Sequence, residues 1–500
     1  MSNYIVNSDS LTMVADAIRA KAGTSATLVF PNGFVSAVEN ISGGGEDTLE
    51  IFLDRKLSVY CNDKRTKIPH GAFYSCTSLT SVSLPACDYV GHDAFHDCDS
   101  LTSIDLPVCT YIGNRAFYGC DSLESVNLPN CAKITYSAFC QCDSLTYIDL
   151  PVCSSIGYSA FQLCDNLTSV SLPACSYIGN NAFYYCSNLT HIDLPNCINI
   201  GDYAFGSCNK LSVVNLPNCT SVGHVAFNEC ASLTSIDLPV CSYVGDTAFW
   251  SCTSLSSVNL PVCTSIGTNT FRLCDNLISV NLPLCSYIGN GAFYGCNKLT
   301  SIDLPNCNYL DGNAFYSCSN LNSVSLPNCT SVWKYAFNAC SNLCSIDLPI
   351  CSVIDEGTFR SCVNLTSASL PICTSIGSDA FYKCKSLTSI DLPACNYVGF
   401  SAFALCTSLA SVNLPVCTDI ENYAFYNCDE LYAIYLGAST VCTLAGSQAF
   451  GCTPYQDYGY GYSVKPYIYI PSSLMTEYKS APNWSYFSSY FSAIENAPAI

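Results

Sequence analysis

The sequence predicts an α/β solenoid, a chain wound into many similar coils, and three observations support this prediction. A leucine recurs every 22 residues from Leu79 to Leu431 without an insertion. A cysteine falls at every eleventh residue from Cys76 to Cys428. An Ala-Phe pair, or a close variant of it, occurs once in nearly every unit. Self-similarity at a fixed period of this length is typical of stacked structural repeats, and it overrides the usual division of a long chain into globular domains.

Each coil is numbered here from its leucine and follows the pattern L-T-S-I-D-L-P-x-C-x-x-I-G-x-x-A-F-x-x-C-x-S. The fragment formed by Leu79, Val82, Leu84 and Cys87 is the strand signature of a leucine-rich repeat. Positions 1, 4, 6 and 12 are expected to point into the core, and positions 3 and 5 into solvent. We therefore predict leucine-rich-repeat coils of 22 residues, with a parallel β-sheet on one face and short helical turns on the other.

Other positions of the coil have physical roles as well. Pro at position 7 offers no N–H and is expected to end the strand pairing. Gly at position 13, as in Gly91 and Gly113, is expected to supply a turn with positive φ. Phe at position 17 gives a row of rings from Phe73 to Phe425. Ala368 replaces the Ile or Val of position 4 in one coil, and is expected to underfill the core there.

The regular cysteines occupy positions 9 and 20, on the inward side of two bends, which predicts buried thiols that act as small apolar groups. Disulfides between coils are the alternative, but stacked residues lie about 4.8 Å apart, whereas a disulfide needs Cβ atoms about 3.8 Å apart. Zinc sites need C-x-x-C pairs or His/Cys clusters, so no metal is expected. Only Cys140 and Cys344, which stand off the regular spacing, are expected to face solvent and react.

Acidic residues at position 5 are separated along the coils. Asp never occupies this position in two adjacent coils, because Ser or Asn stands between. Like charges stacked at cross-strand distance would destabilise the sheet, and this spacing keeps the carboxylates about 10 Å apart. The aspartates concerned are Asp105, Asp149, Asp193, Asp237, Asp303, Asp347 and Asp391.

Composition argues against several functions. The chain has 38 acidic against 18 basic residues and a net charge of −20, so it would repel a phosphate backbone and no nucleic-acid partner is expected. The sequence has no apolar run long enough to span a bilayer, so no membrane insertion is expected. The first residues lack the basic and apolar regions of a secretory signal, which favours synthesis and folding in a reducing bacterial cytoplasm.

The two ends of the chain differ from the coils. Residues 1–42 are expected to form a small helical attachment module, followed by a glycine-rich linker at 43–48. Residues 49–70 are expected to cap the N-terminal edge, 71–436 to form the solenoid, and 437–500 to cap the C-terminal edge. A unit of about forty residues buries little core alone, so the first module is expected to dock on another protein or to assemble with copies of itself.

Two family resemblances follow from these segments. Coils such as "IGNRAFYGCDSLESVNLP", residues 112–129, resemble the BspA-like leucine-rich repeats, and "IYIPSSLMTEYKSAPNW" resembles the end cap of the same family. The stretch "LTMVADAIRAKAGTSATLVFPNGFVSAVENI" is similar to a module at the start of tail-associated proteins in prophages of Gram-positive bacteria. The first resemblance implies adhesion, and the second implies attachment to a virion.

Variation between the coils marks a candidate binding surface. It concentrates at positions 14, 15, 18 and 19, which share an outward face in the expected helical turn. Tyr, Trp and Arg at position 18 are side chains that binding surfaces favour, and the alternative is simple drift of an exposed face. The candidates on this turn face are Tyr74, Tyr118, Tyr184, Trp250, Arg272, Tyr294, Tyr316, Arg360, Tyr382 and Tyr426.

The strand face, formed by positions 3 and 5, is the second candidate surface. Its Ser, Asn and Asp side chains are suited to hydrogen-bond a glycan, although the uniformity of its rows counts against selective recognition. The least repetitive residues on it are Tyr147, Asp149, His191 and Asp193.

No catalytic pattern occurs in the sequence. The five histidines stand in no nucleophile–base arrangement, and no nucleophile elbow, P-loop or dinucleotide-binding motif is present, so we expect neither a catalytic residue nor a cofactor. The predicted function is a non-enzymatic receptor-binding component of a phage or prophage tail. Its solenoid would bind a host cell-surface glycan or protein, and residues 1–42 would bind other virion tail proteins. The alternative is a bacterial cell-surface adhesin or protein-interaction scaffold.

Overall fold

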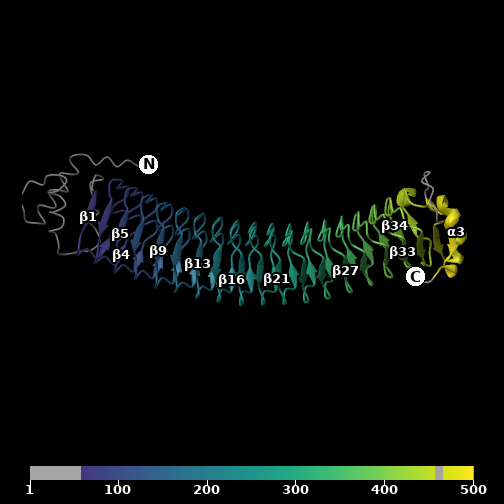
Figure 1. Ribbon diagram of the computed structural model, residues 1–500, viewed down its shortest axis with the longest axis horizontal. Helices are drawn as coiled ribbons and strands as arrows, with labels where there is room; N and C mark the ends of the chain where they lie inside the picture. Colours follow the sequence, from purple (N-terminus) through teal and green to yellow (C-terminus); the bar gives the residue numbers. More distant parts are fainter. Residues whose placement is uncertain (1–57, 456–464, 499–500) are drawn as a thin grey trace, which may run out of the picture.

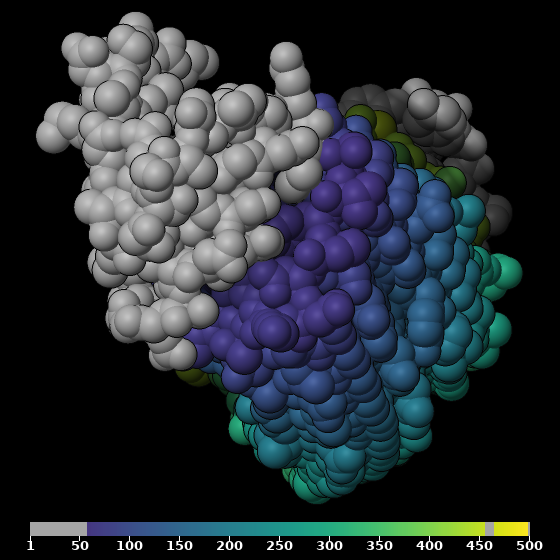
Figure 2. Space-filling model, turned by 90° about the vertical axis from the view of Figure 1, so that its left-hand side faces the viewer, coloured from purple at the N-terminus to yellow at the C-terminus, as the bar shows by residue number. Residues whose placement is uncertain are grey.

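The computed structural model of the chain describes residues 58–455 and 465–498. These residues form a gently curved rod in which the coils follow one another from the N-terminal to the C-terminal end (Figure 1). Seen from the N-terminal end, the coils lie behind one another in register, so that equivalent side chains form rows along the molecule (Figure 2). The predicted parallel-strand solenoid of 22-residue coils is confirmed.

The first strand of a coil covers positions 3 to 5, and its middle side chain points inward between two exposed or half-buried ones. Most of these strands pair in parallel with their equivalents one coil later, as Ser81 does with Ser103, and they form separate sheets of two to five strands. These strands are β1 (Val59–Cys61), β3 (Ser81–Ser83), β5 (Ser103–Asp105), β7 (Ser125–Asn127), β9 (Tyr147–Asp149), β11 (Ser169–Ser171), β13 (His191–Asp193), β15 (Val213–Asn215), β17 (Ser235–Asp237), β19 (Ser257–Asn259), β21 (Ser279–Asn281), β23 (Ser301–Asp303), β25 (Ser323–Ser325), β27 (Ser345–Asp347), β29 (Ser367–Ser369), β31 (Ser389–Asp391), β33 (Ser411–Leu414) and β35 (Ala433–Leu436).

The second strand covers positions 11 and 12, the latter of which is the buried Ile, Val or Leu of the core. Two parallel sheets of nine strands result, with the same register of one coil. These strands are β2 (Lys67–Ile68), β4 (Tyr89–Val90), β6 (Tyr111–Ile112), β8 (Lys133–Ile134), β10 (Ser155–Ile156), β12 (Tyr177–Ile178), β14 (Asn199–Ile200), β16 (Ser221–Val222), β18 (Tyr243–Val244), β20 (Ser265–Ile266), β22 (Tyr287–Ile288), β24 (Tyr309–Leu310), β26 (Ser331–Val332), β28 (Val353–Ile354), β30 (Ser375–Ile376), β32 (Tyr397–Val398), β34 (Asp419–Ile420) and β36 (Thr443–Leu444).

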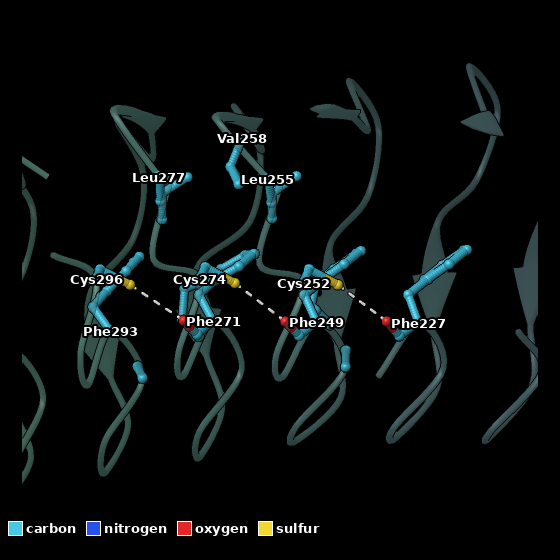
Figure 3. Close-up of a cluster of buried hydrophobic side chains, with 14 of the residues drawn as sticks. Phe227, Phe249, Cys252, Leu255, Val258, Phe271, Cys274, Leu277, Phe293 and Cys296 are labelled. Carbon is cyan, nitrogen blue, oxygen red and sulfur yellow. Dashed lines mark hydrogen bonds between the residues drawn. The ribbon is translucent and has the colours of Figure 1, made fainter. Parts of the chain in front are cut away.

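The core repeats with the coil. The phenylalanine rings of position 17 stack from coil to coil, with centroids 4.8 Å apart at Phe73 and Phe95. The thiol at position 20 donates to the carbonyl oxygen of the phenylalanine one coil earlier, as Cys252 does to Phe227 at 3.1 Å (Figure 3). The thiol at position 9 donates instead to a carbonyl two residues along its own coil. The regular cysteines are buried, as predicted, and burial raises the pKa of thiols such as Cys98 and Cys109.

The expected helical turns do not form in the coils that the structure describes. Positions 14 to 19 make tight turns in which positions 15 and 19 adopt positive φ, 54° at Asp93 and 55° at Asp97. Their N–H groups donate across to the next coil, from Asp93 to the Asn114 carbonyl at 2.9 Å. Helix formation would need those donors within the coil, so the coil-to-coil ladder takes the place of a helix.

Two further expectations are corrected. Gly at position 13 serves close packing and not a positive φ, because a Cβ on Gly113 would lie 2.6 Å from the backbone of Gly91 one coil earlier. Cys140 is not exposed but 5% accessible, and burial raises its pKa to about 11. Cys344 is exposed as predicted, and so is Cys61, which the sequence analysis did not single out.

The C-terminal end closes over the last coils. β37 (Tyr467–Ile470) pairs with β35, and β38 (Phe491–Ala493) pairs with β37. Trp484 is fully buried there and donates its Nε1–H to the Cys442 carbonyl at 2.6 Å. The helical elements of this end are η1 (Ser447–Phe450), η2 (Ser472–Leu474), α3 (Met475–Ser480), η3 (Trp484–Tyr490) and η4 (Ile494–Asn496).

The helical attachment module predicted for residues 1–42 lies outside the described residues, as does the glycine-rich linker. Within the described ranges, no helix has the length and apolar character needed to span a bilayer.

Candidate functional site

The turn face carries the ten aromatic and arginine candidates at position 18 in one row along the solenoid. Tyr74, at the N-terminal end of the row, is 46% exposed, and the other nine are half-buried. Most of the row is therefore only partly open to a partner.

Contacts between neighbouring coils account for this burial. Tyr294 and Tyr316 stack with ring centroids 4.7 Å apart, and the Arg272 guanidinium lies 3.9 Å from the Tyr294 ring centroid. Arg360 lies over the ring of Tyr382 in the same way, at 4.3 Å. The aromatic faces are thus used within the protein, as in ordinary stacking and cation–π contacts. Position 18 stabilises the stack of coils in addition to forming a surface.

The strand face is hollowed over the N-terminal coils. A first hollow of about 560 Å³ lies over β1 to β9 and is lined by rows of Ser, Asp and Asn side chains. A second hollow of about 290 Å³ lies over β9 to β13. Tyr147 lines both hollows, Asp149 lines the first, and His191 and Asp193 line the second. All four strand-face candidates therefore border these depressions.

The register of the sheet places these four side chains on one surface. Ser169 pairs with both Tyr147 and His191, so the two candidates lie two strands apart, roughly 10 Å. Tyr147 is 49% exposed. Within the described ranges, no hydrogen bond holds the Tyr147 hydroxyl or the Asp149 carboxylate, so both are open to a partner.

Four of the seven spaced carboxylates of position 5 accept a hydrogen bond from an asparagine one coil later. Asn215 donates its Nδ2–H to Oδ1 of Asp193 at 2.7 Å, and Asn127 does the same to Asp105 at 2.8 Å. Each such carboxylate is oriented by one bond and keeps its other oxygen for an incoming donor. The strand face can therefore accept hydrogen bonds in a fixed pattern.

Sequence reasoning missed part of this surface. Cys61, Ser81 and Ser103 line the first hollow. The two serines belong to a uniform row that carries no signal of a site, and Cys61 lies in the segment expected to be the N-terminal cap.

The comparisons with known proteins were consistent with this architecture. The family model described as "BspA type Leucine rich repeat region (6 copies)" matches residues 66–190, 176–284, 264–372 and 352–465. A leucine-rich repeat protein from Bacteroides ovatus is 27% identical with a TM-score of 0.51, and the match covers 68% of this chain and 91% of that one. A T. pallidum leucine-rich repeat protein is 26% identical with a TM-score of 0.27, covering 40% and 78%. No curated protein matches.

Proposed function

The chain belongs to the BspA-type leucine-rich-repeat family, and from this premise we propose that it is a non-enzymatic binding scaffold at a bacterial cell surface. The strand face is its contact surface in this proposal. The observation that carries it is the pair of hollows over β1 to β13, bordered by Tyr147 and His191. Long faces of solenoids serve as extended binding surfaces in many repeat proteins.

The chemistry of the strand face fits a polar partner, a glycan or a protein on another cell. Serine hydroxyls and carboxylates oriented by asparagine offer donors and acceptors at a spacing set by the strands. Tyr147 adds an amphipathic ring of the kind that dominates contact surfaces. The net charge of −20 disfavours polyanionic partners.

The position of the protein in the cell tests this function. Antibodies against the solenoid should label intact bacteria, and protease added to intact cells should remove the signal. Labelling that appears only after lysis would contradict a cell-surface scaffold.

The resemblance of residues 11–41 to prophage tail modules supports a second candidate, a receptor-binding tail component. Residues 1–42 would then dock the solenoid on other tail proteins. Fractionation separates the two candidates: the tail function predicts the protein in purified phage particles from an induced culture, and its absence there together with presence in cell envelopes would reject it.

A further inference from the structure

Three adjacent coils carry a residue other than glycine at position 13. Ordinary coils need glycine there because a Cβ would collide with the preceding coil, at 2.8 Å for Gly179. Asp311, Trp333 and Asp355 nevertheless occupy this position in succession. The ladder continues through them, since the Trp333 N–H donates to the Leu310 carbonyl at 3.0 Å. Because three successive coils carry a residue that is unfavourable for packing at this position, we expect a function of these residues at the surface.

Position 13 has two isolated exceptions as well, Thr135 and Glu421, and Thr135 shows the contrast. Thr135 is 7% exposed and donates its hydroxyl to the Ile112 carbonyl at 2.8 Å, so it is a packing residue. Trp333 is 45% exposed. A large aromatic side chain held this far in solvent gains little from the core, and exposed tryptophan is enriched at binding sites.

Two tyrosines continue the aromatic surface along the axis. The rings of Tyr287 and Tyr309 stack with centroids 5.3 Å apart, and Tyr309 lies 5.8 Å from Trp333. The Tyr287 hydroxyl donates to Oδ2 of Asp311 at 3.0 Å, and burial together with this carboxylate raises the Tyr287 pKa to about 12. The row ends at Trp333, because position 11 holds no further aromatic residue in the next two coils, where it is Ser331 and then Val353.

Fixed carboxylates border the rings. Oδ1 of Asp311 accepts the Gly312 N–H at 2.7 Å, and Oδ1 of Asp355 accepts the Glu356 N–H at 2.7 Å. Among the described residues, no hydrogen bond occupies Oδ2 of Asp355. The Trp333 ring is tilted by 44° to Tyr309 and is not stacked on it, so its face can attract the partly positive C–H groups of a sugar ring, and oriented carboxylates accept the sugar's hydroxyl protons. The same carboxylates would repel phosphate, sulfate or uronate groups.

We propose that this aromatic patch, formed by Tyr287, Tyr309, Asp311, Trp333 and Asp355, is a binding site for a neutral polysaccharide that runs along the solenoid axis. The coils advance by about 4.8 Å, which is close to the length of one hexopyranose in an extended glycan, so successive sugars meet successive coils. The patch lies on the second strands and the turns after them, away from the strand face, and is independent of the partner proposed there.

Affinity electrophoresis of the full chain in native gels tests the site, with laminarin, xylan, mannan and dextran as immobilised probes. At least one probe should retard the wild-type protein. Trp333→Gly restores the ordinary residue of position 13, so this variant should fold at least as well while its affinity falls by about tenfold or more.

Two controls complete the design. Tyr136→Ala removes an exposed, stacked tyrosine elsewhere on the solenoid and should leave retardation unchanged. The strand-face variant Tyr147→Ala/His191→Ala should also bind the probe normally, which separates this site from the proposed contact surface. The proposal is overturned if none of the four polysaccharides retards the wild type, or if Trp333→Gly is retarded as strongly as the wild type.

Discussion

Each regular thiol of this protein is a packing group with a hydrogen-bond donor. At position 20 the Sγ–H satisfies a phenylalanine carbonyl one coil away, so it links two coils while filling space. Desolvation raises the pKa of these thiols, which keeps them protonated and unreactive. Exposure, not spacing, therefore decides which cysteines react.

Maleimide labelling of the native protein, read by intact mass, checks this account of the thiols. We expect two fast labels, at the exposed Cys61 and Cys344, and a slower one at the partly exposed Cys452. Cys140 should stay unlabelled until the protein is denatured, when all 38 cysteines become available. Rapid native labelling of more than three sites would contradict a core of buried thiols.

Glycine at position 13 gives a second prediction. Gly179→Ala would place a Cβ 2.8 Å from the Gly157 backbone, which cannot move without separating the coils. We expect a loss of about 3 kcal/mol in the free energy of unfolding, at the upper end of overpacking. Gly71→Asn is the control, since its φ of +64° suits asparagine and a Cβ there meets nothing within 4 Å. Urea unfolding would contradict the close-packing role if the two variants lost equal stability.

The sequence showed that position 13 favours glycine but not why. Repetition marks a constraint, and both a positive φ and a close backbone approach predict the same residue. Only the structure distinguishes these two causes. It places positive φ at positions 15 and 19, on residues as varied as Asp93, Arg115 and Tyr203, and not at position 13. The exposure of Cys140 was also predicted wrongly, because the sequence does not show that side chains at position 18 stack between coils and bury one another.

At the scale of elements, β29 is the weak strand of the solenoid. Ala368 lies in register with Ile346, and it is only partly buried where other coils carry Ile or Val. Ala368→Ile should stabilise the protein by about 1 to 2 kcal/mol, since it buries additional methyl groups. Ala380→Val in the same coil is the contrast, because Ala380 is fully buried and should be overpacked. Equal effects of the two changes on urea unfolding would contradict an underfilled core.

At position 21, aspartates occupy adjacent coils, whereas at position 5 they never do. Asp99, Asp121, Asp143 and Asp165 occupy position 21 in successive coils. Burial raises the pKa of Asp121, and Asp99 and Asp97 raise it further. The folded state thus binds this proton more tightly than the unfolded state, so the ionised carboxylate destabilises the fold at neutral pH and protonation relieves this as the pH falls.

Asp121→Asn should therefore raise the free energy of unfolding at pH 7 by about 0.5 kcal/mol, a value typical of exposed charge pairs. The gain should shrink as the pH falls through the raised pKa of Asp121, because the wild-type carboxyl is then neutral too. Asp88→Asn, whose neighbours at position 10 include Thr66 and Thr110, should show no such gain. A gain that is constant from pH 7 to pH 3 would contradict the repulsion.

Across the whole molecule, the period predicted the coil, the inward positions and the stacked phenylalanines, because each follows from one residue pattern repeated in register. The helical turns were predicted wrongly, since the competing coil-to-coil hydrogen bonds join residues far apart in the chain. The strand-face candidates Tyr147 and His191 were found as exceptions to uniform rows. The hollows around them were not predictable, because residues of several adjacent coils line them together and the repeat pattern treats those coils alike.

The strand face is favoured over the turn face because its aromatic and polar groups are less engaged in contacts within the protein. On the turn face, Tyr294 and Tyr316 cover each other, whereas on the strand face Tyr147 borders two hollows with its hydroxyl unoccupied by described residues. Binding to cells should therefore depend on the strand face.

Flow cytometry with the labelled full chain on a panel of bacterial and animal cells is the most direct measurement of this claim. The variants to compare are Tyr147→Ala/His191→Ala and the turn-face control Tyr294→Ala/Tyr316→Ala, each with an unfolding midpoint measured alongside. The strand-face variant should lose about tenfold or more in affinity, while the turn-face variant binds like the wild type. Binding that survives the strand-face change and falls with the turn-face change would contradict the account.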